Sequence, residues 1–430
     1  MRNFYIIFIF NLLLLSGHSR SFGQVTIDAE FRPRTEFRQG FNQPLADSLK
    51  PGFITLQRTR LNFNYSGSLL NARITLQDSR VFGETDTKQP STATSGGVSI
   101  YEAWTEVLLF SGVSIKIGRQ GVQFEDGRLF AYSPWSNTGN SHDLMQLIYN
   151  TKGFNARLGF AYNNQKAYNA DSSYYNVSKT YKQLAFLHLS KNLMPGFDIS
   201  LLGISEGFNT SKIDLELYHR YTLGGTLKLE KEGMPLTALL TGYYQTGKSS
   251  ATVHLDAFMM ALKAAYTFTP TIDAVAGFDY FSGSESTLEA SSTNTFNKLP
   301  YGTNHAFYGY MEYWGTLPKG GLIKYFAGTN LKFTKKLSSG VTWYGFSLDK
   351  AMTVSSTEVK GSIGSELDVA FNYKFSSVTA VQVAWCGYFA NDNTNMLKFK
   401  TTKPDTKFPQ FVYVMFTIKP QFYKTPAPAN

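Results

Sequence analysis

The chain has 430 residues, of which 15% are aromatic and 17% charged, and its formal net charge is +10. A mean hydropathy of −0.20, despite 26 Tyr and 35 Phe, requires apolar and polar residues to be interleaved rather than gathered in blocks. The single Cys386 excludes an intramolecular disulfide and a cysteine-based metal site. The length admits several ordinary domains or one large all-β domain, so the residue pattern has to decide.

The first 23 residues have the composition of a secretory signal peptide. Arg2 opens a basic region, "FYIIFIFNLLLL" forms an apolar core, and Ser21 and Gly23 are small residues preceding a cleavage site after Gly23. The alternative is a membrane anchor, but a spanning helix needs about 20 apolar residues, and Asn11 interrupts this run. We therefore predict cleavage and an exported mature chain, 24–430.

After the signal peptide, apolar and polar residues alternate at period 2. The segment 28–39, "DAEFRPRTEFRQ", places charged side chains on one face of a strand and Phe31 and Phe37 on the other, and 70–77, "LNARITLQ", alternates similarly. This period indicates strands whose faces meet two environments. In a soluble sandwich the polar face meets solvent, whereas in an outer-membrane barrel the apolar face meets lipid and the polar face a wet lumen.

Strand length and the placement of aromatic residues favour the barrel. Runs such as "VTIDAEFRPRTEFRQ" and "LDAFMMALKAAYTF" exceed the roughly five or six residues usual in soluble strands and satisfy the roughly 9–11 needed to cross a bilayer at a tilt. Tyr and Phe recur near strand ends, for example Phe110, Tyr162 and Phe268, where a barrel has its interfacial girdles.

The connections between predicted strands alternate between short and long. Short turns are expected near 67–69, 111–112, 152–153, 192–196, 232–234, 269–271, 335–340 and 376–377, and long polar connections near 40–52, 82–97, 124–142, 163–180, 207–214, 248–252, 284–320, 350–360 and 391–408. Short periplasmic turns and long extracellular loops are the rule for outer-membrane barrels. The pattern predicts a single transmembrane antiparallel β-barrel of about eighteen strands, all-β, with both termini on the periplasmic side.

Two segments depart from the regular pattern of spanning strands. The stretch "HAFYGYMEYW" at 305–314 looks like a strand, but as a spanning strand it would break the even count, so we place it in the connection 284–320, above or inside the barrel. Pro33 interrupts the first strand, and proline removes a donor from the ladder. We expect a bulge or weakened pairing there, with a bend that directs Arg32 and Arg34 into the pore.

The segment "GRQGVQFEDGRLFAYSPWSNTGNSHD" at 118–143 resembles the alginate export family of Gram-negative outer-membrane barrels, in its branch with a GRQ…DGR…W…D motif. The resemblance extends to "EFRPRTEFRQGF" at 30–41, "YEAWTE" at 101–106 and "GSELDVAFNYKF" at 364–375. It implies an eighteen-stranded barrel in the cell outer membrane with a constricted, electropositive pore for an anionic polysaccharide.

If the apolar faces meet lipid, a set of charged side chains faces the lumen as a candidate pore lining. These are Arg32, Arg34, Arg38, Arg58, Arg60, Arg73, Lys116, Arg157, Arg220 and the acid Glu366. Such a wall suits a polyuronate, because guanidinium groups match carboxylates bidentately and nearby acids shorten each dwell. The alternative is a ladder of charges that braces the wall without a transport role.

The predicted loop 124–142 carries the densest part of the motif. In the functional interpretation it folds into the pore, Arg128 contacts a sugar carboxylate and Trp135 stacks on a sugar ring. In the packed interpretation Asp126 pairs with Arg128 or Arg119, and Trp135 is a hydrophobic anchor. We favour the packed interpretation for Trp135 and the functional one for Arg128.

The sequence favours no enzyme and predicts no catalytic, cofactor or metal site. Ser141, His142 and Asp143 are adjacent, so in an extended chain they point to alternate sides, and a relay needs converging geometry. The five histidines of the mature chain lack metal-ligand spacing.

We therefore expect an outer-membrane channel for an anionic polysaccharide or oligosaccharide, such as an alginate-like polyuronate, diffusing through an arginine-rich lumen. The alternatives are an anion-preferring porin for small solutes, and a closed structural or adhesin barrel with long surface loops. Expected partners are the saccharide, outer-membrane lipid and lipopolysaccharide, and a periplasmic secretion or uptake protein, but no nucleic acid.

Overall fold

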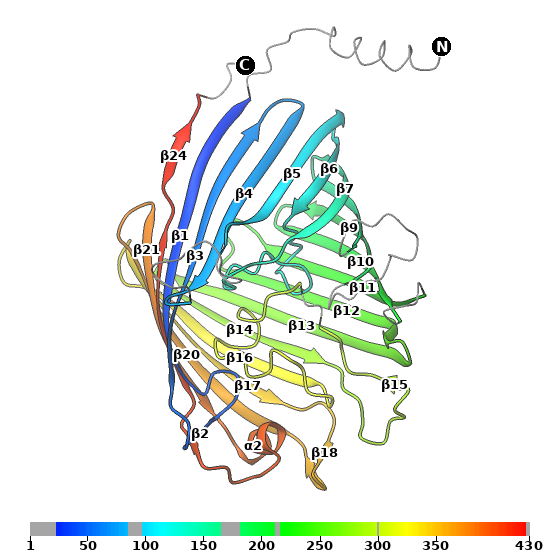
Figure 1. Cartoon of the computed structure of the whole chain (residues 1–430), viewed down its shortest axis with the longest axis vertical. Coiled ribbons are helices and arrows are strands. Elements are labelled where there is room, and N and C mark those ends of the chain that lie inside the picture. The colour runs from blue at the N-terminus through cyan, green and yellow to red at the C-terminus, as the bar shows by residue number, and fades with distance from the viewer. Residues whose placement is uncertain (1–22, 85–96, 165–180, 211–215, 299–300, 427–430) are drawn as a thin grey trace.

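The computed structural model describes residues 23–84, 97–164, 181–210, 216–298 and 301–426 (Figure 1). The predicted signal peptide lies outside the described residues except for Gly23, and its cleavage stays a prediction. The described residues form one antiparallel β-barrel, into which some of its long connections fold.

The main sheet has 20 strands, of which β15 (Ser292–Thr293) and β24 (Gln421–Lys424) are short additions. The wall strands are β1 (Gln24–Gln39), β3 (Gly52–Ser66), β4 (Leu70–Val81), β5 (Ser99–Phe110), β6 (Val113–Gln120), β7 (His142–Thr151), β8 (Phe154–Tyr162), β9 (Gln183–Met194), β10 (Phe197–Asn209), β11 (Leu217–Glu230), β12 (Leu236–Ser250), β13 (Val253–Thr269), β14 (Ile272–Phe281), β16 (Leu322–Lys332), β17 (Leu337–Ser347), β20 (Ser362–Lys374), β21 (Thr379–Phe389) and β23 (Gln410–Ile418). Because β1 pairs antiparallel with both β3 and β23, the barrel is closed. The predicted fold of eighteen wall strands is confirmed.

The alternation in the sequence sets which side chains point into the barrel. On β13, Met259 and Ala261 are buried, whereas Met260 and Leu262 are 47% and 48% exposed. Side chains on a strand point alternately to its two faces, so the exposed apolar residues gather on the outside of the wall. An outward apolar surface is what a bilayer requires of a barrel.

The predicted short turns join neighbouring strands, as residues 152–153 join β7 to β8. They lie at the end of the barrel where β1 begins and β24 ends, and the long connections lie at the other end (Figure 1). The predicted extent of one long connection is wrong. Residues 251–252 alone link β12 to β13, because both strands extend further than the polar composition of 248–252 suggested.

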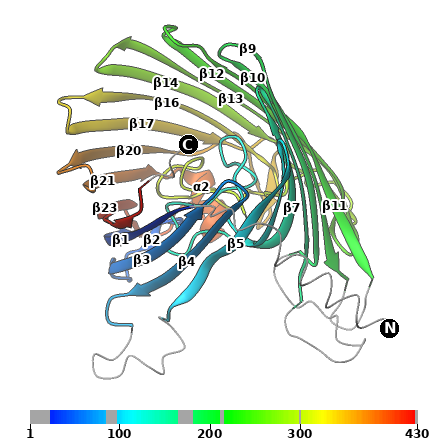
Figure 2. The same cartoon turned by 90° about the horizontal axis from the view of Figure 1, so that it is seen from above.

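Parts of two long connections, 121–141 after β6 and the described residues 282–298 and 301–321 after β14, fold into the ring of strands (Figure 2). We call them together the plug. The strand-like interpretation of 305–314 is wrong, since this segment forms a series of turns in which Gly309 has a φ of 75°. Its aromatic side chains pack in several directions instead of alternating between two faces.

The hydrophobic core lies inside the barrel, where the plug meets the wall. Phe130 and Tyr308 of the plug are at most 1% exposed. Phe130 stacks on Tyr301 with ring centroids 5.3 Å apart, and Tyr313 stacks on Tyr388 of β21 at 3.6 Å. The plug is therefore packed as a protein interior is packed, on itself and on the wall.

The last long connection contains α2 (Asp392–Phe399), which the sequence analysis did not predict. Asn391 caps its first turn in a reciprocal capping box with Thr394, and Lys400 ends it at a φ of 60°. Two further short antiparallel pairs occur in the long connections. β18 (Met352–Val354) and β19 (Thr357–Val359) form a hairpin, whereas β2 (Leu45–Ala46) pairs with β22 (Thr406–Lys407) of another connection. No helix in the described part of the chain is long and apolar enough to span a membrane.

The predicted bulge at Pro33 is wrong. The register between β1 and β3 passes through Pro33 without a shift, and the bulge of β1 lies at Ile27 and Asp28, opposite β24. On the side of β1 away from β3, where β23 and β24 both pair, the bridges to β23 stop at Phe31 and resume at Arg34 in the same register. A local gap in pairing, which was the other expectation, accommodates the missing proline donor.

Replacing Leu262 with Arg should lower the free energy of unfolding by about 2–4 kcal/mol, the cost of a cation at mid-depth on a lipid-facing wall. Leu262 lies midway along β13. Tyr266→Arg, on the same face nearer the short turns, should cost only about 0–1 kcal/mol. Urea unfolding in phospholipid vesicles measures both variants, and equal costs at the two depths would contradict lipid contact.

Candidate functional site

The first two strands of the wall bring the predicted arginines together. Arg32, Arg34 and Arg58 are 5%, 4% and 2% exposed. Arg32 lies directly opposite Arg58 across the β1–β3 pair. Like charges in this position destabilise a strand pair, so the two side chains need acceptors.

Backbone carbonyls of the plug are those acceptors. The hydrogen bonds run from Arg32 to Pro134, Trp135 (3.1 Å) and Ser136 (2.8 Å), from Arg34 to Trp135 (2.7 Å), from Arg58 to Pro134 (3.2 Å) and Ser136 (2.8 Å), and from Arg60 to Thr138 (3.1 Å). A guanidinium offers five N–H donors in a fixed geometry, which suits several carbonyls of one loop. These four arginines therefore hold the plug against the wall.

Two glutamates on β1 balance the arginine cluster. Arg58 Nε donates to Glu30 at 2.8 Å. Glu36 accepts one hydrogen bond from Arg34 and one from Arg38, both at 2.6 Å. Within the described residues, Arg38 does not bond to the plug carbonyls, and it keeps 35% of its side chain exposed. Among the arginines of β1, Arg38 is therefore the one that remains open to solutes.

Trp135 stands in a stack that joins the wall to both loops of the plug. The Arg34 guanidinium lies 3.6 Å from the centre of the Trp135 ring. Trp135 stacks on His305 at 3.6 Å with an angle of 2°, and His305 stacks in turn on Tyr310 at 4.2 Å. Such contacts add to the area that an aromatic side chain buries, and the geometry is that of the packed interpretation of Trp135.

Arg128 is held in an ion network of the plug and wall. Its guanidinium lies 3.0 Å from Asp279 of β14 and 3.4 Å from Asp126, and Asp279 also lies 2.6 Å from Lys324 of β16. Burial alone would lower the pKa of Arg128, but Asp279 and Asp126 outweigh it, so that this pKa is raised. Lys324 donates to the carbonyl of Phe307 at 2.6 Å, which ties the second plug loop to the same network.

On the far side of the barrel, Arg220 pairs with an acid on the neighbouring strand and is not free to bind a solute. It donates to both oxygens of Glu206 at 2.8 Å, and the Tyr301 hydroxyl of the plug donates to the same carboxylate. β10 and β11, which carry these residues, lie about half-way round the strand order from β1. The plug thus spans the barrel from one wall to the opposite one.

Glu366 and Asp368 on β20 hold the turn at 309–311. Glu366 accepts the backbone N–H of Met311 at 2.8 Å, and Asp368 accepts that of Tyr310 at 3.0 Å. Gly309 lies so close that a Cβ there would collide with the Glu366 carboxylate. This close approach explains glycine at that position.

Besides Arg38, the candidate cations that remain accessible lie on β4, β6 and β8. Lys116 and Arg157 line a cavity of about 480 Å³ at the short-turn end, together with the plug residue Tyr132. Arg73 is 36% exposed and pairs with Glu102 at 3.0 Å. Unlike the cluster on β1 and β3, these side chains are not bound to the plug carbonyls in the described structure.

The residues adjacent to the family motif do not form a relay. His142 is buried and lies 2.8 Å from the Tyr181 hydroxyl, whereas Asp143 is 62% exposed and pairs with Arg119. The described residues contain no group of His, Cys, Asp and Glu arranged to hold a metal ion.

The sequence analysis missed the acids that bind the predicted cations across the barrel. Asp279 lies 151 residues from Arg128, and Tyr301 lies 95 residues from Glu206. The signal was present in part, because Asp279 is one of two acids in a mostly apolar strand, "IDAVAGFDYF", and it lies between two aromatic residues. A buried charge of this kind is expected to have a partner, but the sequence does not say which.

Comparison with known protein families assigns the chain to one of them. The profile of the alginate export family matches residues 24–383. The chain belongs to the alginate export family. No curated protein is significantly similar to it in sequence.

Solved structures similar to this alginate export family member are outer-membrane porins. OccAB1 of Acinetobacter baumannii has a TM-score of 0.64 at 10% identity, over 93% of this chain and 97% of that chain. OccD3 (OpdP) of Pseudomonas aeruginosa has a TM-score of 0.59 at 12% identity, over 92% of each chain. These likenesses show the fold. Family and fold are those of outer-membrane transport channels and porins, not of enzymes.

Arg32→Met should loosen the plug. The carbonyls of Pro134, Trp135 and Ser136 would each lose one donor and keep the other, from Arg58 or Arg34, and a hydrogen bond to a charged group contributes about 1.5–3 kcal/mol. We expect faster hydrogen exchange in residues 133–138 and a higher single-channel conductance. Arg38→Met removes the same charge from the same strand without touching these carbonyls, and equal effects of the two variants would contradict the plug-holding role.

Acid should also loosen the plug. Burial lowers the pKa of His305, although Glu312 at 3.6 Å acts in the opposite direction. A lowered pKa means that the contribution of His305 to the stability of the plug is fully present above pH of about 6.5, the unfolded value, and is lost as the pH falls below that value toward the lowered pKa. Conductance should therefore rise between pH 7.5 and 5.5. His305→Phe keeps a stacked ring without a titrating group, and a rise as large as in the unmodified protein would exclude His305 as the cause.

Proposed function

We propose that this barrel passes an anionic polysaccharide or oligosaccharide of the polyuronate class across the outer membrane. The observation that carries the proposal is the set of lumen cations left accessible once the plug is held: Arg38, Arg73, Lys116 and Arg157. Membership of the alginate export family supports the same class of substrate.

The accessible cations are accompanied by acids. Glu102 pairs with Arg73, and Glu106 lines the same cavity as Lys116 and Arg157. A guanidinium binds a carboxylate through two hydrogen bonds, while a competing acid nearby keeps each contact brief. Conduction needs sites that attract the solute yet release it, and a wall of mixed sign with excess cations meets both needs.

Passage also requires a change in the plug. The plug is bonded to β1 and β3 on one side and to β10 on the other, so a polymer cannot cross this level of the lumen while every contact is in place. In the proposal, part of the plug shifts during transport. No cofactor takes part. The outer wall contacts lipid and lipopolysaccharide, and a periplasmic secretion or uptake partner acts at the short-turn end.

A second candidate is an anion-preferring porin for small solutes. The likeness of the fold to outer-membrane porins favours it, and a plugged lumen with small cavities suits solutes smaller than a polymer. The two candidates predict different responses to an acidic polymer, because a polymer that enters the lumen but traverses slowly interrupts the ion current.

Planar-bilayer recordings test the proposal. Polyguluronate should interrupt the single-channel current, whereas a neutral glucan of equal length should not. Changing Arg73, Lys116 and Arg157 together to Gln should weaken this block by about tenfold, or about 1.4 kcal/mol, and should lower anion selectivity.

The matched control changes three lysines at the same end of the barrel that lie outside the cavities: Lys152, Lys191 and Lys231. It removes the same charge and should leave the block unchanged. A current that small anions carry but polyguluronate never interrupts would favour the small-solute porin.

A further inference from the structure

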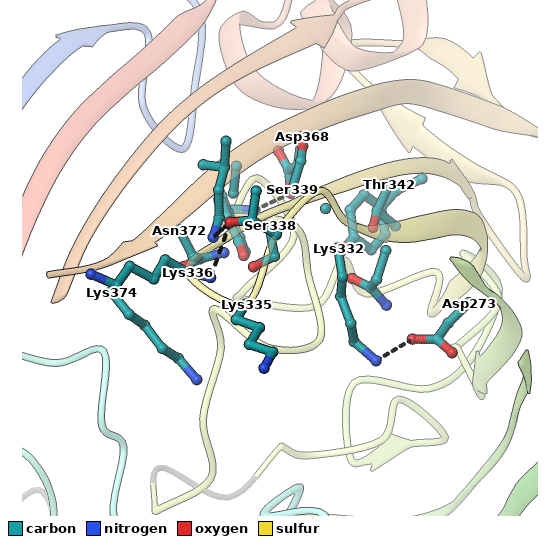
Figure 3. Close-up of a pocket in the computed structure, with 17 residues that line it drawn as sticks. Asp273, Lys332, Lys335, Lys336, Ser338, Ser339, Thr342, Asp368, Asn372 and Lys374 are labelled. Atoms are coloured by element: carbon teal, nitrogen blue, oxygen red, sulfur yellow. Dashed lines mark hydrogen bonds and ion pairs between the residues drawn. The ribbon is translucent and has the colours of Figure 1, made fainter. Parts of the chain in front are cut away.

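A second cavity lies at the short-turn end, apart from the arginines of β1 and β3 that hold the plug. It has a volume of about 470 Å³ and is lined by β14, β16, β17, β20 and the turn 333–336 (Figure 3). Its size falls in the roughly 300–1,000 Å³ range of small-ligand sites. In the strand order this wall lies nearly opposite β6, so the cavity is separate from the one that Lys116 and Arg157 line.

Four lysines surround this cavity: Lys332, Lys335, Lys336 and Lys374. Lys332 lies 3.5 Å from Asp273. Within the described ranges, the other three, which we call the rim lysines, have no carboxylate within ion-pair distance. Figure 3 shows Lys335 and Lys374 extending away from Asp368. Gathering unpaired cations at one mouth costs self-repulsion, which an anionic ligand would relieve.

The inner lining offers hydrogen-bonding groups suited to sugar hydroxyls. It contains Asn330, Ser338, Ser339, Thr342 and Asn372. Hydroxyl and amide groups both donate and accept, as sugar hydroxyls do. A simple anion such as phosphate would use the rim lysines but would leave this part of the cavity unmatched.

The floor of the cavity is formed in part by the plug. Tyr310 lies there beside Tyr344 of β17 and Asp368 of β20. Asp368 accepts the backbone N–H of Tyr310 at 3.0 Å. Two aromatic side chains give a sugar ring apolar surface to pack on, while the Asp368 carboxylate repels another carboxylate. The ligand's acid group is thereby directed outward to the lysines and its hydroxyl face inward.

We propose that this cavity is a periplasmic recognition site for uronate units of an acidic oligosaccharide, with carboxylates on the rim lysines and hydroxyls on the inner lining. The inference deepens the proposed function and rests on it for the class of saccharide. It adds the place where the saccharide is bound at the periplasmic mouth, on a floor that includes the plug residue Tyr310.

The test is equilibrium binding, which does not depend on conduction. Isothermal titration of the detergent-solubilised mature protein with tetraguluronate, and with neutral maltotetraose, measures Kd. The rim variant changes Lys335, Lys336 and Lys374 to Gln. These exposed lysines lie in or beside turns, so the barrel should fold, and heat-modifiable mobility in gels checks that it does. The control variant changes Lys152, Lys191 and Lys231 to Gln.

We expect tetraguluronate to bind the unmodified protein and the control variant alike, and the rim variant at least about tenfold more weakly, with no binding of maltotetraose. Absence of binding to the unmodified protein, equal binding by the rim variant, or displacement by an equal concentration of inorganic phosphate would overturn the inference. Rim-dependent binding without block of the current would uphold this site and overturn the proposed function. If polyguluronate still blocks the current of the rim variant, and this variant binds tetraguluronate as tightly as the unmodified protein, the proposed function stands and the inference about this cavity fails.

Discussion

A carbonyl oxygen folded away from water must find a donor, and this requirement organises the interior of the barrel. The carbonyls of the plug segment 134–138 face β1 and β3, and arginines on these strands donate hydrogen bonds to them. The same carbonyls explain why Arg32 and Arg58 stand directly opposite each other. Without the plug this like-charged pair would weaken the strands, so wall and plug stabilise each other.

This arrangement divides the lumen cations into two groups. Arg32, Arg34 and Arg58 are occupied by the plug and by Glu30 and Glu36, so they hold structure in the described state. Arg73, Lys116 and Arg157, and the rim lysines on the opposite wall, are accessible to solutes. In the proposed function, selectivity at the short-turn end therefore follows from the second group, of which Arg73, Lys116 and Arg157 share the strand periodicity of the first group.

The wall could be predicted from the sequence because each strand carries its own evidence: alternation fixes the inward face, and turn residues fix the count. The interior could not be predicted in the same way. The alternation of 305–314 resembled a strand, but most side chains of the segment are buried, whichever way they point, so its apolar residues carry no information about a strand period. Partners such as Arg128 and Asp279 lie on elements far apart in the chain, and local pattern contains no information about their meeting.

The strength of these contacts limits how the plug can move. Each charge-assisted hydrogen bond contributes about 1.5–3 kcal/mol, and a whole protein is stable by only about 5–15 kcal/mol, so releasing every contact at once would cost as much as unfolding. A partial change is less costly at 134–138, where the arginines bind neutral carbonyls. A carboxylate forms a stronger bond to guanidinium than a carbonyl does. In the proposed function, an advancing polyuronate thus replaces the plug carbonyls on the same arginines, and the substrate itself supplies the free energy that displaces this part of the plug.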